Sequence, residues 1–272
     1  MAITHREFDY IKGLIKQEAA IVIDTGKEYL VESRLMPLAQ KHGLASVKDL
    51  VDNLSKRDNQ QLVTQVVEAM TTNETSFFRD FYPFEALKKK VIPDLIANRS
   101  AAKELVIWCA ATSSGQEPYS LAMLIKENFP QLATWRLRII CSDISEEMLE
   151  RTRSGVYNQL EVNRGLPVSL LMKYFKQDGT RWIVKDDLRR MLEVRLVNLA
   201  APWPHLPQVD LIMMRNVLIY FDQVTKVSIL KHAYDQLKVN GVLLLGSTET
   251  TINMNLSYQV QQYEKLSYYS KL

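Results

Sequence analysis

The sequence has no apolar run long enough to cross a membrane, and its first residues do not form the hydrophobic core of a secretory signal peptide. Cysteine is also scarce. Its two copies, Cys109 and Cys141, lie at the ends of apolar runs, where reduced core thiols are common. We therefore expect a cytosolic protein that does not insert into a membrane and does not depend on disulfides.

Concentrated positive charge is missing as well. The formal net charge is +3, with 34 Lys and Arg against 31 Asp and Glu, which is too mild to indicate a nucleic-acid partner. The histidines are scattered and indicate neither a catalytic constellation nor a metal site. No Gly-x-Gly-x-x-Gly follows an apolar run, which disfavours a nicotinamide dehydrogenase.

Residues 104–119 contain the pattern around which the rest of the sequence is organised. Leu105 to Cys109 form an apolar run without alternation, typical of a strand that is covered on both faces. Small residues follow as far as Gly115, and Pro118 suits the first turn of a helix. A strand, a loop of small residues and a helix form the first unit of a nucleotide-binding α/β sheet.

Two carboxylates indicate the charge and the sugar of the ligand. Glu117 lies where it would repel the phosphates of a dinucleotide and attract a positively charged nucleoside. Asp143 ends a second apolar strand, 137–143, where an acidic residue accepts the ribose hydroxyls of the ligand in this type of sheet. The alternative role for Asp143 is an N-cap for the helix that follows.

The hydrophobic periodicity predicts a division into two domains. Apolar residues at helical spacing, without a strand pattern, predict an N-terminal helical domain and linker over 1–82. Residues 83–272 alternate between strand and helix patterns, with the first helix interrupted near Pro93. A mixed segment at about 155–190 predicts a small inserted β-subdomain, and such insertions more often serve recognition than chemistry.

The later part of the sequence predicts the remaining elements of the sheet. The alternating segment 192–198 and the apolar stretches at 209–214 and 242–245 predict strands. Between them, a helix is expected from Asp222 to about Lys238, closed by Asn240-Gly241. The alternating segment 263–271 predicts a final edge strand.

Three basic residues recur at intervals of seven in the helical domain: Lys27, Arg34 and Lys41. This spacing places them along one side of a helix, where they could bind an acidic partner helix as substrate. The alternative is a solvated face with charges scattered by chance. Pro37 lies within the same segment and is expected to kink or break it.

Four segments together resemble the CheR family, the chemotaxis receptor methyltransferases. They are residues 72–79 (TNETSFFR), 108–120 (WCAATSSGQEPYS), 142–145 (SDIS) and 215–222 (RNVLIYFD). The resemblance implies a Rossmann-like class I methyltransferase sheet with an N-terminal helical domain and a small inserted β-subdomain. It also implies S-adenosylmethionine as methyl donor, S-adenosylhomocysteine as product, and glutamate side chains of chemoreceptors as acceptors.

The resemblance also implies roles for individual residues. Those carried over as donor contacts lie in the linker and after the strands: Asn73, Thr75, Arg79, Glu117, Asp143, Asn198, Leu199, Asn216 and Val217. Arg79 and Tyr220 are implied to lie nearest the chemistry, Arg79 holding one oxygen of the acceptor carboxylate and Tyr220 donating a second hydrogen bond. The alternatives are a salt bridge of Arg79 to Asp80 or a neighbour, and core packing for Tyr220.

One segment departs from the family pattern. The usual Gly-His-Ser-Glu after a late strand is Gly246-Ser247-Thr248-Glu249 here, and no site role is predicted for it. The absence of an obvious catalytic His or Cys constellation agrees with the implied chemistry, because a glutamate carboxylate with a pKa of ~4.3 is already ionised at neutral pH. Such a reaction requires alignment and the exclusion of water.

The implied partners are the cytoplasmic methylation helices of chemoreceptors, with a receptor C-terminal peptide as a second contact for the inserted β-subdomain. We expect a monomer. Two alternatives stay open. One is a methyltransferase of RNA or of a protein amide nitrogen, whose usual Asn/Asp-Pro-Pro-Tyr-like loop is replaced by Arg215-Asn-Val-Leu. The other is a receptor-binding adaptor without catalysis, against which the acidic pair Glu117 and Asp143 argues.

Overall fold

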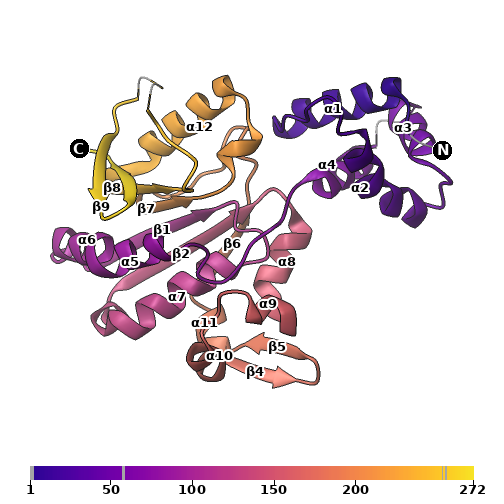
Figure 1. Cartoon of the computed structure of the whole chain (residues 1–272). Coiled ribbons are helices and arrows are strands. Elements are labelled where there is room, and N and C mark those ends of the chain that lie inside the picture. The colour runs from indigo at the N-terminus through magenta and orange to yellow at the C-terminus, as the bar shows by residue number, and fades with distance from the viewer. Residues whose placement is uncertain (1–2, 57–58, 253, 255) are drawn as a thin grey trace. The chain divides into compact units, whose positions relative to one another are not determined.

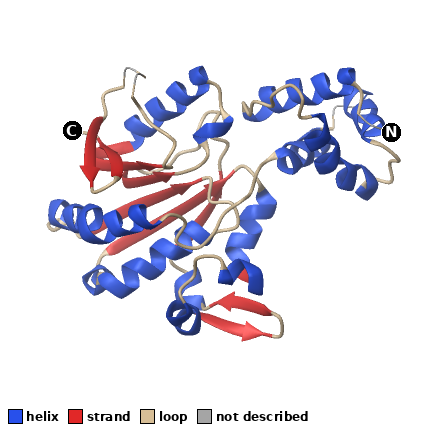
Figure 2. Cartoon of the chain, viewed as in Figure 1, coloured by secondary structure: helices blue, strands red, loops and turns tan. Residues whose placement is uncertain are grey.

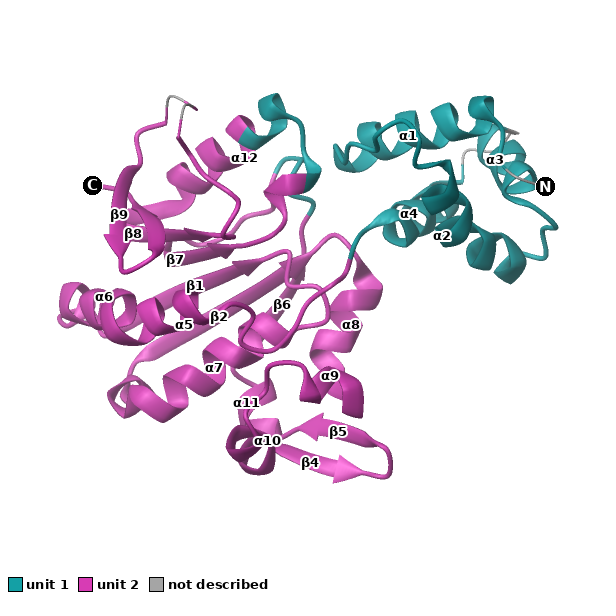
Figure 3. Ribbon diagram, in the orientation of Figure 1, with its two compact units in different colours: residues 1–72, 198–202, 220–226 teal, residues 73–197, 203–219, 227–272 magenta. Residues whose placement is uncertain are grey.

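The computed structural model describes residues 3–56, 59–252, 254 and 256–272. The chain divides into two compact units, coloured separately in Figure 3. The first unit comprises residues 1–72, 198–202 and 220–226. The second comprises residues 73–197, 203–219 and 227–272.

The first unit is built of helices. They are α1 (His5–Ala19), α2 (Glu28–Lys41), α3 (Val47–Lys56) and α4 (Gln60–Met70). Helix α1 begins with a capping box in which the Thr4 hydroxyl accepts from Glu7 N and the Glu7 carboxylate accepts from Thr4 N. Phe8, Ile11 and Ile15 recur on one face of α1 and are fully buried, as the helical spacing predicts.

Helix α2 continues through Pro37, so the proline does not break the helix, and the alternative of a kink stays a prediction. A proline inside a helix costs about 3 kcal/mol because it removes one backbone hydrogen bond and crowds the preceding turn. Val31, Leu35 and Ala39 are fully buried along the opposite side of α2, and Pro37 itself is exposed. Burial of this apolar face offsets the local cost of the proline.

The second unit contains a large sheet (Figures 1 and 2). Its strands are β1 (Glu104–Ala110), β2 (Arg136–Asp143), β6 (Leu192–Leu196), β7 (Val209–Met214), β8 (Leu237–Leu245), β9 (Gln259–Tyr263) and β10 (Leu266–Ser270). Among the described residues, their order is β6-β2-β1-β7-β8-β10-β9, with parallel pairing from β6 to β8. The fold class expected from the sequence, a Rossmann-like class I methyltransferase sheet, is confirmed.

The two central strands, β1 and β7, lie within the core. Almost every residue of β1 and all of β7 are buried, as expected for strands covered on both faces. The Trp108 indole N–H donates to Ser142 Oγ at 2.8 Å and so joins β1 to β2. The direction of the strand order changes at β1, and ligands of open α/β sheets bind beside such a switch point, at the carboxyl ends of the strands.

The helices before and around the sheet are α5 (Phe81–Ala86), η1 (Leu87–Val91), α6 (Ile92–Arg99), α7 (Gln116–Asn128), η2 (Pro130–Thr134), α8 (Glu146–Ser154) and α12 (Gln223–Gln236). The expected interruption near Pro93 takes the form of η1, a π-helical segment. Its bond from Ile92 N to Leu87 O spans five residues. The helix thus widens just before the proline instead of ending there.

Two predictions for the last part of the chain are wrong. Asn240-Gly241 does not close α12, which ends at Gln236. It lies within β8, where Asn240 is left-handed (φ 61°) and the register with β7 shifts. Residues 263–271 are not one edge strand, because a turn with Glu264 at φ 51° divides the segment into β9 and β10, and β9 forms the edge.

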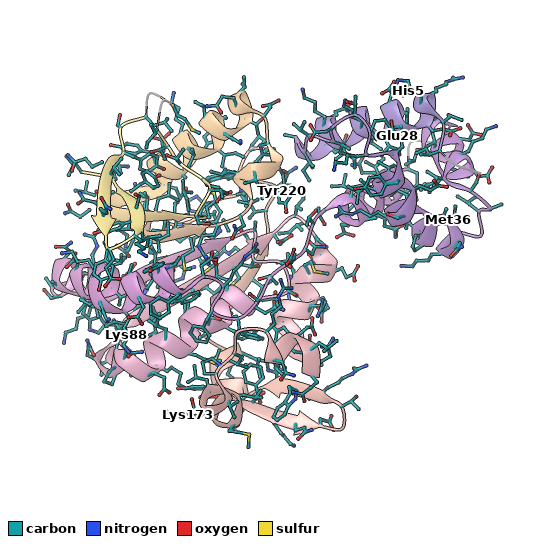
Figure 4. All side chains as sticks on the ribbon, viewed as in Figure 1. His5, Glu28, Met36, Lys88, Lys173 and Tyr220 are labelled. Carbon is teal, nitrogen blue, oxygen red and sulfur yellow. The ribbon has the colours of Figure 1, made fainter. Side chains whose placement is uncertain are left out.

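The segment between α8 and β6 forms a small β-containing subdomain, drawn below the large sheet in Figure 2. Its elements are β3 (Val156–Asn158), α9 (Gln159–Asn163), α10 (Val168–Tyr174), β4 (Phe175–Asp178), β5 (Arg181–Val184) and α11 (Asp186–Arg189). The described strands pair in the order β3-β5-β4. On α10, Lys173 (labelled in Figure 4) forms a 2.6 Å ion pair with Glu127 of α7.

Gly165 connects this subdomain to the linker. It has φ 89°, and a Cβ at this position would lie 2.1 Å from the carbonyl oxygen of Phe77, whose ring is fully buried against Tyr157 and Phe175. We expect Gly165→Ala to lower the free energy of unfolding by about 2 kcal/mol or more, through strain and displaced packing. Urea denaturation measures this. Gly179→Ala is the control, because Gly179 also has positive φ (57°) but open space around its Cα.

Among the described residues, no helix combines the length and the hydrophobicity that a membrane-spanning segment requires.

Candidate active site

The loop after β1 contains three residues with positive φ. Ala111, Ser113 and Gly115 have φ values of 55°, 50° and 92°. A Cβ on Gly115 would lie 2.9 Å from the side chain of Thr152, so this position requires glycine. The Tyr157 hydroxyl donates to Ser114 O at 2.6 Å and fixes the other side of the loop. These contacts build a narrow turn of small residues at the carboxyl end of β1, as the sequence predicts.

Asp143 orients this loop from the end of β2. Its Oδ2 accepts from Ser113 N at 2.7 Å and its Oδ1 accepts from Ser145 N at 3.1 Å. The N-cap of α8 is Ser145 and not Asp143. Asp143 is therefore a buried carboxylate beside the small-residue turn, which is the position expected of a ribose acceptor.

The linker before α5 is fastened to the same region. The Ser113 hydroxyl donates to Asn73 O at 2.8 Å, and Phe78 N donates to Ser120 Oγ at 2.9 Å. Phe78 and Asp80, on either side of Arg79, are both left-handed, with φ 46° and 64°. Such strained residues persist only where their surroundings fix them. The linker is thus packed and ordered around Arg79.

An ion cluster around the buried Arg215 joins the linker, α7 and the end of β7. Arg215 donates from Nη1 to Glu117 Oε2 at 2.6 Å and from Nη2 to Asp80 Oδ2 at 2.7 Å and to Arg79 O at 2.8 Å. Its side chain is 1% exposed. The salt bridge proposed between Arg79 and Asp80 is wrong, because Asp80 pairs with Arg215.

Arg215 neutralises part of the negative charge around Glu117 but not all of it. Asp80, Glu117 and Arg215 together carry one net negative charge. Arg79 and Glu249 also act on Glu117 in opposite directions, and their formal charges add up to zero, so the formal charge of the whole group stays at minus one. Burial raises the pKa of Glu117 above its usual value of 4.5, and the charge and hydrogen bond of Arg215 oppose that shift. The region still favours a cation.

The guanidinium of Arg79 has N–H groups that are not used in hydrogen bonds among the described residues. Its Nη1 donates to Glu74 O at 2.9 Å, and among the described residues no carboxylate lies within salt-bridge distance of its guanidinium. Its side chain is half-buried. Thr75, four residues earlier, is also half-buried in the same linker. An arginine with unused N–H groups in a fixed linker can bind an incoming carboxylate.

Glu249 is a residue that the sequence analysis missed. Its carboxylate accepts from the backbone N–H groups of Asn216, Leu218 and Gly246 at 2.7–2.8 Å. Asn216 is left-handed (φ 58°), and Val217 beside it is half-buried. A glycine followed three residues later by a glutamate, directly after a buried strand, is the signal that could have revealed this contact.

Besides the basic residues of α2, three expected site residues belong to the first compact unit. The Asn198 side-chain amide donates to Glu18 O at 2.7 Å and its Oδ1 accepts from Ala200 N at 3.0 Å, while Leu199 is buried. Tyr220 ends η3 (Leu218–Tyr220) and is labelled in Figure 4. It is half-buried, and its carbonyl accepts from Val22 N. Their contacts to a donor or an acceptor stay predictions.

The three basic residues of the helical unit differ in their surroundings. Lys27 precedes α2 and lies 5.9 Å from the Tyr29 ring centre, and Lys41 is exposed at the last residue of α2. Arg34 donates to Met70 O at 2.6 Å and to Thr71 O at 3.0 Å. Arg34 therefore holds the end of α4, and its role in binding an acidic helix stays a prediction.

The sequence matches two models of one protein family. The model of the CheR methyltransferase SAM-binding domain matches residues 73–266, and that of the CheR methyltransferase all-alpha domain matches residues 6–71. The chain belongs to the CheR methyltransferase family. It is 40% identical to chemotaxis protein methyltransferase 1 of Pseudomonas aeruginosa, over 96% of both chains. It is 39% identical to chemotaxis protein methyltransferase Cher2 of Pseudomonas putida, again over 96% of both chains.

As a member of the CheR family, the protein is a methyltransferase that binds S-adenosylmethionine. The residues present fit this donor. The net negative charge around Glu117 suits a sulfonium, and Glu117 Oε1 has no hydrogen bond among the described residues. The turn at Ser113 allows close approach, and Asp143 lies beside it. No group of three or more metal-ligating side chains occurs in the described part of the chain.

Proposed function

We propose that this chemotaxis protein methyltransferase transfers the methyl group of S-adenosylmethionine to glutamate carboxylates of chemoreceptors, which forms glutamate methyl esters. The observation that carries the proposal is the juxtaposition, in one unit, of the negatively charged cluster around Glu117 with an arginine, Arg79, that has unused N–H groups. The cluster attracts a cationic donor, and the arginine attracts an anionic acceptor. The curated relatives are named for chemotaxis, which supports chemoreceptors as the substrate.

The roles of the chain's own residues follow from these charges. When bound, S-adenosylmethionine supplies an electrophilic methyl group. Glu117 orients the cationic end of the donor, and Asp143 accepts its ribose hydroxyls. Arg79 holds one oxygen of the acceptor carboxylate and leaves the other exposed, and Tyr220 donates a second hydrogen bond. No general base is required, because the acceptor is already ionised. Catalysis then consists of alignment and the exclusion of water.

The proposed partner is the cytoplasmic methylation helix of a chemoreceptor, which carries the proposed glutamate acceptors. Lys27 and Lys41, exposed at the two ends of α2, suit such a helix, and Arg34 between them adds a third positive charge. The inserted β-subdomain, with β4 as an edge strand, suits a receptor C-terminal peptide. The protein acts as a monomer in this proposal.

The proposed function is tested by incubating the full chain with methyl-labelled donor and receptor cytoplasmic fragments. We expect label on the receptor that is released as methanol by mild base, since methyl esters hydrolyse readily. Label that resists base would indicate amide-nitrogen methylation, and label in added RNA would indicate a nucleic-acid substrate. Either result, or no transfer by folded protein with bound donor, contradicts the proposal.

The binding of S-adenosylmethionine is expected to depend on pH through Glu117. Because burial raises the pKa of Glu117, its carboxylate becomes neutral at a higher pH than an exposed glutamate, and donor affinity falls as the pH drops through that value. The effect on folding has the opposite sign. Ionisation of Glu117 costs stability, and this cost is absent below the unfolded pKa and complete above the folded pKa.

Calorimetric titration with S-adenosylmethionine between pH 5 and 8 measures this dependence. Glu117→Gln is expected to weaken binding about tenfold at neutral pH and to flatten the dependence. S-adenosylhomocysteine, which lacks the sulfonium charge, is the matched ligand and should show a weaker dependence. An equal dependence for both ligands in the wild-type protein contradicts the assignment of Glu117 to the sulfonium.

A further inference from the structure

Glu249 is a half-buried carboxylate that is surrounded by backbone donors. Its Oε2 accepts from Asn216 N at 2.8 Å and from Gly246 N at 2.7 Å. Its Oε1 accepts from Leu218 N at 2.7 Å and is also within 3.3 Å of Ile219 N. Hydrogen bonds of this kind, from N–H groups to a charged acceptor, are roughly twice as strong as those between neutral groups.

Gly246 makes this approach possible. A Cβ at residue 246 would lie 2.7 Å from Glu249 Oε2 and 2.9 Å from Asn216 N, distances that Cβ atoms do not tolerate. The end of β8 and the segment after β7 are therefore close because residue 246 has no side chain. The carboxylate of Glu249 fills the space between them.

The segment that follows β7 needs an acceptor of this kind. The pairing of β7 with β8 ends at Met214 opposite Leu245, so the next N–H groups have no strand partner. Asn216 is left-handed (φ 58°), and η3 begins at Leu218, where the first N–H groups of a helical turn are unsatisfied. Glu249 accepts from both places and thereby fixes the path of residues 216–219.

We propose that Glu249 is a positioning residue for the methyl donor. It holds the backbone of Asn216 and Val217, the two predicted donor contacts after β7, in the conformation that receives the donor. The proposal rests on the proposed function, because those two contacts belong to it. The absence of a histidine two residues before Glu249, where the family usually has one, does not affect these contacts, which all involve the glutamate.

The first test is donor binding to Glu249→Gln in the full chain. A glutamine offers one acceptor oxygen, and its NH₂ group faces backbone N–H groups that need acceptors. We expect the dissociation constants of S-adenosylmethionine and S-adenosylhomocysteine to rise about tenfold or more. The KM for the donor should rise more than the KM for the receptor fragment, because Glu249 accepts directly from the backbone of Asn216, which is assigned to the donor, while the acceptor contact Tyr220 lies beyond its hydrogen bonds.

Glu193→Gln is the matched control. Glu193 on β6 accepts from Arg138 at 2.7 and 2.8 Å, so this variant also removes a carboxylate from charge-assisted bonds of the same sheet. It is expected to keep donor affinity within about twofold of the wild-type protein, whatever stability it loses. Equal losses of affinity in the two variants would indicate a general effect of destabilisation and overturn the proposal.

A double-mutant cycle tests the route through Asn216. Asn216→Gly removes the side chain and tolerates the positive φ. If Glu249 acts by placing Asn216, the two substitutions together weaken donor binding less than the product of their separate effects. Independent effects would contradict that route.

If a folded Glu249→Gln protein binds the donor as tightly as the wild-type protein does, the proposal is overturned. The proposed function is tested separately, by the methylation assay on the wild-type chain. Should Glu249→Gln not fold, Glu249→Asp takes its place. Its carboxylate is one methylene shorter and cannot reach both Asn216 N and Leu218 N, so weaker donor binding is again expected. Unchanged affinity in that variant refutes the inference.

Discussion

Arg79→Ala is expected to lower the rate of receptor methylation about 10²-fold at saturating donor, the loss typical for removal of one group that stabilises or aligns the reacting oxygen. The backbone of Arg79 is fixed independently of its side chain, through Arg215 bound to its carbonyl at 2.8 Å and through Phe78 N bound to Ser120 Oγ. The protein should therefore keep its fold. Steady-state methylation of a receptor fragment measures the change.

Two further substitutions show whether the loss belongs to the position of Arg79. Arg79→Lys keeps the positive charge but loses the planar fork of donors, so an intermediate rate is expected. Arg153→Ala, on α8, removes an arginine whose ion pairs with Glu146 and Glu150 are largely solvated, and the rate should not change. A rate for Arg79→Ala within about twofold of wild type removes Arg79 from the mechanism.

The sequence was sufficient to predict the strands and the loops at their carboxyl ends. The apolar run of β1, the small residues up to Gly115 and the acid at the end of β2 are local patterns, and local patterns are determined by neighbours in the chain. The placement of Asp143 and Glu117 could be predicted because the fold brings the ends of parallel strands to one edge, while their contacts with the donor stay predictions. These predictions needed no knowledge of distant contacts.

The ion cluster could not be predicted in the same way. Arg215 lies 98 residues or more away from each of the two acids, Glu117 and Asp80, in the sequence. Nothing in the sequence indicates that one arginine binds both. The alternative role considered for Arg79, a salt bridge to its sequence neighbour Asp80, therefore named the wrong arginine for that acid. Asn240-Gly241 illustrates the same limit, because a left-handed residue before glycine fits a helix end and a strand bulge equally well.

Arg215→Ala is expected to lower the free energy of unfolding by about 3–5 kcal/mol, the usual cost of removing one partner of a buried ion pair. Glu117 would then lie in a site where its side chain is 12% exposed, with no counterion in contact. Its pKa would rise further, because burial remains and the opposing charge of Arg215 is gone. Urea denaturation at pH 7 measures the loss, and Arg153→Ala should lose less than about 1 kcal/mol.

The double variant Arg215→Met with Glu117→Gln separates the loss of the ion pair from the loss of packing. Because it removes both charges of the Arg215–Glu117 pair and fills part of the space, it is expected to recover much of the stability that Arg215→Ala loses. It is also expected to bind S-adenosylmethionine poorly, since Glu117 no longer supplies its charge. Recovery of stability without recovery of binding would show that the cluster is retained for the donor. A double variant as unstable as Arg215→Ala would instead show that Arg215 acts mainly through its contacts with Asp80 and the linker.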